Sequence, residues 1–176
     1  MAVTPARFFS SSALLAFLRC AIEAVVVVTY ISSVMAPSPP FTLRQIDHVV
    51  LRVRNLDASL HFYRDVLGCT LDKVQEKIGL WQVRAGSSLI DLVPLDGVLG
   101  KIGGAGPGLE GHNLDHFALQ IDRFDDAAIR AHLAAHDVRI TDAGQRYGAQ
   151  GTGPSIYILD PDGNTVELKG PPDGAG

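Results

Sequence analysis

Apolar and polar side chains alternate along residues 45–53, a period of two that predicts a strand with one buried face. A helical stripe follows at the spacing of an amphipathic helix, made of Leu60, Tyr63 and Leu67. Asn55 or Asp57 can cap the start of this helix, and Gly68 suits its end. Three more strands are predicted, at about 70–75, 80–84 and 88–93, with a hairpin turn at Gly86-Ser87 between the last two.

The same order returns in the second half of the chain. A strand is predicted at about 114–121, and Asp125 or Asp126 caps a helix whose apolar face includes Ile129 and Leu133. The strands that follow are expected at about 138–140, at 155–159, and after a tight turn formed by Asp160–Asn164. Two glycine-rich segments, 95–113 and 144–154, have no clean period and are expected to be loops.

Each half therefore has the order βαβββ, which predicts an α+β fold built from two tandem modules that form a cleft. Module one covers about 43–94 and module two about 112–170, within a folded domain at 41–172.

An Asp-His dipeptide opens the first strand of each half, and a later strand of each half has one central carboxylate. Alternation places His48, His116, Asp91 and Glu167 on the face opposite the residues that pack under the helices. Four polar groups on an apolar sheet are costly to bury without a partner, and a divalent cation would satisfy them all. Two imidazoles and two carboxylates suit Ni, Co, Mn, Fe or Zn better than Ca or Mg.

Other polar residues divide according to the face they occupy. Arg52, Gln120 and Lys169 share the parity of the four predicted ligands, so we expect them to contact substrate. Asp47 and Asp115 precede their histidines on the other face and are expected to cap or to be solvated. Surface positions are predicted for the helical histidines His61, His132 and His136.

Composition excludes some classes of function. The 176-residue chain has a net charge of −4 and no block of Lys or Arg, which argues against nucleic acid as a partner. Its two cysteines do not make a disulfide framework, and Cys69 is expected to be a small buried hydrophobic residue.

Residues 1–40 form an apolar extension that ends in the breaker run 37–40. Arg19 and Glu23 interrupt its apolar stretch, so a membrane-spanning helix is not expected. A signal segment and an organelle transit peptide are both compatible with the pattern. If Met35 is the initiator instead, residues 1–34 are not native and a cytoplasmic protein is expected.

Residues from about Leu43 to Lys169 resemble the vicinal-oxygen-chelate superfamily, which includes glyoxalase I, fosfomycin-resistance thiol transferases, extradiol dioxygenases and bleomycin-binding proteins. The segments that carry the resemblance are Ile46–Val49, Phe62–Gly68, Leu114–Leu119 and Asp160–Leu168. The resemblance implies paired modules around a metal, with His48, His116 and Glu167 at ligand positions, and a homodimer. Asp91 stands where glyoxalase I-like enzymes typically have Glu, and 93–97 lacks the Asn-Trp-Gly type of sequence found in glutathione-using members.

The resemblance favours a metal-dependent lyase or isomerase similar to lactoylglutathione lyase, acting on a small substrate that chelates the metal through neighbouring oxygens. Glu167 or Asp91 would move a proton between adjacent carbons while the metal stabilises an enediolate. Glutathione is a candidate co-substrate, although both departures weaken the case for a glutathione hemithioacetal. The alternatives are a thiol transferase of the fosfomycin-resistance type, an extradiol-type dioxygenase and a non-catalytic binding protein.

Overall fold

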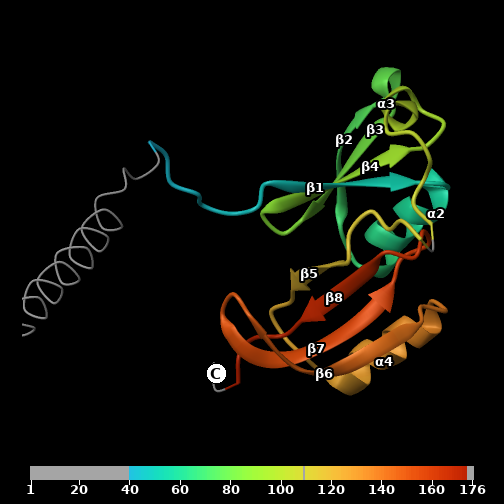
Figure 1. The fold of residues 1–176 in the computed structure, drawn as a ribbon. Coiled ribbons are helices and arrows are strands. Elements are labelled where there is room, and N and C mark those ends of the chain that lie inside the picture. Colours follow the sequence, from blue (N-terminus) through green and yellow to red (C-terminus); the bar gives the residue numbers. More distant parts are fainter. Residues whose placement is uncertain (1–39, 109, 174–176) are drawn as a thin grey trace, which may run out of the picture. The chain divides into compact units, whose positions relative to one another are not determined.

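The computed structural model describes residues 40–108 and 110–173, and residues from Gln45 onward form one compact unit. The predicted extension at 1–40 lies outside the described residues, apart from Pro40. Two four-stranded sheets form the unit, with strand orders β1-β4-β3-β2 and β5-β8-β7-β6 (Figure 1). Each sheet has one parallel pair, β1 with β4 or β5 with β8, and its other pairs are antiparallel. The predicted α+β fold of two tandem βαβββ modules is confirmed.

The first module begins with β1 (His48–Val53), α2 (Leu56–Leu60) and a π-helical turn (His61–Val66). Asn55 caps α2 by accepting a hydrogen bond from the backbone N–H of Ala58, and Gly68 ends the helical segment with a φ of 75°. The module continues through β2 (Thr70–Gln75), a 3-10 turn (Glu76–Ile78), β3 (Leu80–Ala85) and β4 (Ser88–Pro94). These bounds lie close to the predicted ones.

The second module contains β5 (His116–Gln120), α4 (Asp126–Ala135), β6 (Ile140–Gly148), β7 (Gly151–Leu159) and β8 (Thr165–Lys169). In Figure 1, α4 lies against one face of the second sheet. Buried apolar side chains from both modules, including Leu51, Ile90, Leu133 and Ile156, belong to a single core cluster.

Three expectations for the segments between the predicted elements are wrong. The predicted loop 144–154 is the hairpin of β6 and β7, and the short strand expected at 138–140 is instead the nine-residue strand β6. Most of β6 is exposed at the edge of its sheet, so no apolar face marked it in the sequence. The joining segment 95–113 contains a short helix, α3 (Val98–Ile102), whose Val98 and Ile102 are exposed and leave no buried stripe to detect.

Candidate metal-binding pairs

The strand register places one histidine and one carboxylate at equivalent positions in both modules. In the first sheet, Asp91 lies opposite Val50, and Val50 is the second residue after His48 on the same strand. In the second sheet, Glu167 lies opposite Ala118, and Ala118 is the second residue after His116. The identical offset shows that the two half-sites are built in the same way.

The pair in module two is the closer of the two. His116 Nε2 lies 3.7 Å from Glu167 Oε2, and His116 Nδ1 lies 2.6 Å from a carboxylate oxygen of Asp115. Glu167 is 5% exposed and accepts a hydrogen bond from the Ser155 hydroxyl. Partial burial and the adjacent negative charge of Glu167 raise the pKa of Tyr157, whose ring meets the His116 ring edge-on with centroids 5.7 Å apart.

The pair in module one uses a different neighbour for its acid. His48 Nδ1 lies 2.8 Å from Asp47, and the pKa of His48 is raised first by this hydrogen bond and then by the negative charge of Asp91. Asp91 is 5% exposed, and both of its oxygens accept from the Gln82 amide at 3.0 and 3.1 Å. A second amide, Gln75, donates to Gln82 at 3.1 Å.

Asp47 and Asp115 were expected to cap or to be solvated, and their side chains are 87% and 97% exposed. Each also contacts Nδ1 of the histidine that follows it, which leaves Nε2 of that ring available to another partner. Both aspartates precede the first residue of their strand, so strand alternation does not decide where their side chains point. The repetition of the Asp-His dipeptide was the signal that could have revealed this contact.

The structure does not gather all four predicted ligands within one chain. Among residues 40–108 and 110–173, no three His, Cys, Asp or Glu side chains lie close enough together to hold a metal ion. The ligands instead form two pairs on separate sheets, and the metal site stays a prediction. The histidine of each pair is half exposed, at 47% for His48 and 42% for His116.

The three predicted substrate contacts have different surroundings. The Arg52 guanidinium donates to carbonyl oxygens of Gly100, Gly103, Gly104 and Ala105 at 2.6–3.0 Å and so anchors the joining segment. Gln120 donates to the side chain of Gln150. Lys169 is buried, and its ammonium donates to the carbonyl oxygen of Gly153 at 2.8 Å.

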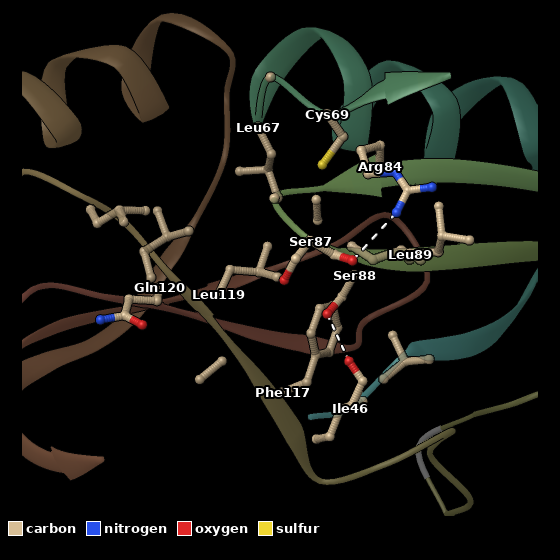
Figure 2. A pocket seen from close by; sticks show the side chains of 18 of the residues that line it. Ile46, Leu67, Cys69, Arg84, Ser87, Ser88, Leu89, Phe117, Leu119 and Gln120 are labelled. Carbon is tan, nitrogen blue, oxygen red and sulfur yellow. Dashed lines mark hydrogen bonds between the residues drawn. The ribbon is translucent and has the colours of Figure 1, made fainter. Parts of the chain in front are cut away.

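Two cavities adjoin the pair of module two. A cavity of about 360 Å³ is lined by His116, Gln120, Glu167, Lys169 and the tip of the β6–β7 hairpin. A larger cavity of about 1000 Å³ lies between the modules (Figure 2), where Leu67 and Cys69 come from module one and Phe117 and Leu119 from β5. Cys69 is buried, as predicted, and its burial raises the pKa of the thiol.

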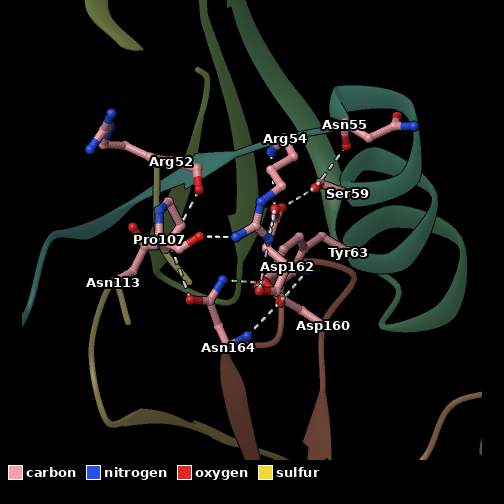
Figure 3. Close-up of polar contacts among 10 residues, drawn as sticks. All are labelled: Arg52, Arg54, Asn55, Ser59, Tyr63, Pro107, Asn113, Asp160, Asp162 and Asn164. Carbon is pink, nitrogen blue, oxygen red and sulfur yellow. Dashed lines mark hydrogen bonds and ion pairs between the residues drawn. The ribbon is translucent and has the colours of Figure 1, made fainter. Parts of the chain in front are cut away.

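A separate polar cluster joins the two modules away from the pairs (Figure 3). The Tyr63 hydroxyl donates to the Asp160 carboxylate at 2.7 Å, and Asn164 donates to the same carboxylate through its backbone and its side-chain amide. Asp162 accepts from the backbone N–H of Arg54 at 3.0 Å. Hydrogen bonds therefore link the β7–β8 turn of module two to the helical segment of module one and to Arg54, which follows its first strand.

The remaining histidines on the helices are exposed, as predicted. His61 is paired with Asp65 at 2.9 Å, and His132 contacts the carbonyl oxygen of Val66 at 2.8 Å. Within the part of the chain that the structure describes, no helix is long and apolar enough to span a membrane.

Comparison with known families decides the relationship that the motifs suggested. The sequence profile of the glyoxalase/bleomycin resistance protein/dioxygenase superfamily matches residues 45–168. The chain belongs to this superfamily. Its predicted membership is confirmed, and the match spans both modules.

Solved structures of this superfamily's fold are similar to the chain. An integron cassette protein from V. cholerae is 25% identical with a TM-score of 0.57, over 74% of this chain and 97% of that chain. A virulence protein from Salmonella typhimurium has the same identity and TM-score, over 74% of this chain and 99% of that chain. Lactoylglutathione lyase from Agrobacterium tumefaciens is 21% identical with a TM-score of 0.50, over 76% and 96% of the two chains, and shows the shared fold alone.

Proposed function

We propose that the protein is a metal-dependent lyase or isomerase of the glyoxalase type. Its substrate is a small molecule that binds the metal through two neighbouring oxygens. The observation that carries this proposal is the repeated half-site, in which an Asp-bound histidine faces a buried carboxylate in each module. Membership of a superfamily that contains glyoxalases supports it.

The proposed site needs two copies of the chain. One pair supplies a histidine nitrogen and a carboxylate, which is too few donors for a stable site, whereas two pairs supply four. In the described sheets, β1 and β5 each pair on one side only, so each histidine lies on a strand with an open edge. We infer a homodimer in which His48 and Asp91 of one copy face His116 and Glu167 of the partner subunit.

The chain's own residues would then divide the work. A bound divalent metal would supply electrostatic stabilisation of the negative charge that develops on the substrate oxygens. Asp47 and Asp115 orient the two imidazoles through Nδ1. Asp91 and Glu167 are the carboxylates available to accept and return a proton at carbon, and their burial shields that proton from bulk water.

Elemental analysis of protein purified without chelator tests the metal. The parent chain is expected to contain stoichiometric Ni, Co, Mn, Fe or Zn, while His48→Ala and His116→Ala each lose it. His136→Ala is the matched control, since His136 is an exposed histidine directly after α4 and outside both pairs. Metal retained in both site variants, or absent from the parent, contradicts the proposal.

Mixed dimers test whether two copies share the site. Neither His48→Ala nor His116→Ala alone can build an intact four-donor site across a dimer. When the two variants are unfolded and refolded together, about half of the dimers contain one copy of each. Each mixed dimer has one intact site, where a parent dimer has two. About one quarter of the parent metal content should therefore return. A site built within one chain would recover nothing on mixing.

A substrate screen follows from a positive result. It should include glutathione hemithioacetals, catechols and epoxides with a thiol, because these separate the glyoxalase type from the dioxygenase and transferase types. Turnover that requires neither metal nor the two carboxylates would exclude all three.

A further inference from the structure

The cavity beside His116 and Glu167 contains a buried lysine that the proposed metal chemistry does not use. Lys169 is 9% exposed and lines this cavity together with Gln120 and Gln150. It follows Glu167 by two positions on β8, so the two residues share a face and their Cα atoms are about 7 Å apart.

The lysine ammonium has only part of its hydrogen-bonding capacity satisfied. It has three donors, and it donates one hydrogen bond, to the carbonyl oxygen of Gly153. Within the described residues, Lys169 forms no salt bridge. The nearby carboxylate of Glu167 is directed instead to Ser155 and His116. A buried cation is costly unless an anion accompanies it.

The backbone around Lys169 is shaped to admit its side chain. A Cβ atom at Gly148 would lie 3.0 Å from Lys169 Cε, and one at Gly153 would lie 3.2 Å from Nζ and 2.3 Å from the carbonyl oxygen of Pro171. Both glycines therefore leave room in the β6–β7 hairpin that a larger residue would fill.

The fold itself does not require a lysine at this position. The register pairs Gln120 with Lys169 in module two and Arg52 with Val93 in module one, so Val93 is the structural equivalent of Lys169. Val93 is apolar and 4% exposed. A module of this design is thus compatible with an apolar residue here, and the lysine is particular to the cavity of module two.

We propose that Lys169 binds an anionic group of the substrate, such as a carboxylate, while the neighbouring oxygens of the same molecule reach the His116–Glu167 pair. This inference rests on the proposed function and narrows its substrate class to small anions. The ammonium N–H groups that do not donate to the carbonyl oxygen of Gly153 donate to the anion. This charge-assisted contact offsets the cost of burying the lysine.

Two hydroxamic acids, one without and one with a carboxylate, test the inference. Acetohydroxamic acid has no carboxylate and chelates metals through two neighbouring oxygens, and succinomonohydroxamic acid adds a carboxylate that is anionic at pH 7. Isothermal titration of the metal-loaded, full-length protein should show the anionic probe binding about tenfold more tightly or better, which is the scale of one charge-assisted contact.

Substitutions at Lys169 then assign the preference. Lys169→Met should bring the two affinities within about twofold and leave the binding of acetohydroxamic acid unchanged, whereas Lys169→Arg should keep part of the preference. Lys101→Met is the matched control, because Lys101 is exposed on α3, and it should keep the full preference. Circular dichroism checks folding, and the comparison of probes in the parent stands without any variant.

The outcomes separate the two proposals. Equal binding of both probes by the parent, or a preference that survives in Lys169→Met, overturns the role of Lys169 and leaves the metal site intact. Failure of both probes to bind the metal-loaded protein overturns the metal-chelating function and this inference together.

Discussion

The two modules share one arrangement for the proposed metal and differ in almost everything around it. Each has an Asp-His dipeptide at the start of its edge strand and a buried carboxylate at the same register on the neighbouring strand. The acid of module one is held by the amide of Gln82, and that of module two by the hydroxyl of Ser155.

The positions further along the same strands show the divergence most clearly. Arg52 in module one anchors the joining segment, while its equivalent Gln120 lines the cavity of module two. Val93 is packed in the interior, while its equivalent Lys169 lines that same cavity. On the function we propose, the repeated arrangement would bind the metal, and the positions that differ in module two would contact the rest of the substrate.

The largest expected effect comes from neutralising either acid. Asp91→Asn and Glu167→Gln keep the side-chain size but remove the charge, so each should lower turnover by about 100-fold or more on the substrate found by screening. Steady-state kinetics with metal content measured in parallel separates lost chemistry from lost metal. Asp65→Asn, at an exposed acid on the π-helical turn, should leave turnover unchanged. Full turnover in both site variants would remove the acids from the reaction.

A smaller effect is expected from the aspartates that orient the histidines. Asp47→Ala and Asp115→Ala each remove the partner of Nδ1 and should weaken metal affinity by about 10- to 100-fold. Competition with a coloured chelator measures this, with Asp126→Ala as a control at an exposed acid of α4. Because the contact is repeated, the two losses should match, and a loss in only one module would show that the half-sites are not equivalent.

Sequence patterns predicted strands that alternate or that form short apolar runs. The strand β1 fell close to its expected bounds because its side chains alternate in burial, and β4 and β8, which are mostly buried on both faces, fell close to theirs because they are apolar around one central carboxylate. The strand β6 was missed because its residues 141–145 are exposed and include no large apolar side chain. The alternation of side chains along a strand placed His48 and His116 on the expected faces of their sheets. Alternation does not show which residues of another sheet lie near that face. The separation of the two pairs could therefore be seen only in the structure.

A third difference between the modules lies in their last hairpins. Module one turns through Gly86-Ser87, whereas the Asp160–Asn164 turn of module two reaches Tyr63 of module one. Tyr63→Phe removes a hydrogen bond to a buried carboxylate and should lower the free energy of unfolding by about 2 kcal/mol in urea titrations at pH 7. The exposed Tyr147→Phe is the control.

The pH dependence gives an independent check on Tyr63. Burial, followed by the charge of Asp160, raises the pKa of Tyr63 well above its ordinary value. The folded state therefore holds the phenol proton more tightly than the unfolded state, so this contribution to stability is present below about pH 10 and is lost as the pH rises further. Tyr63→Phe should show a shallower alkaline fall in stability than the parent, and an equally steep fall would exclude Tyr63 as its cause.

The smallest predicted effects concern the helix caps, where the modules should behave alike. Asn55 and Asp125 each accept a hydrogen bond of 3.0 Å from a backbone N–H at the first turn of their helices. Asn55→Ala and Asp125→Ala should each lower the free energy of unfolding by about 1 kcal/mol, and the double variant should lose the sum because the caps share no partner. Asp57→Ala, an acid in the first turn of α2 that does not cap it, should cost less. If removing the cap in one module leaves the free energy of unfolding unchanged, that helix is held by packing alone. The two modules would then be equivalent in their candidate metal-binding pairs but not in their helices.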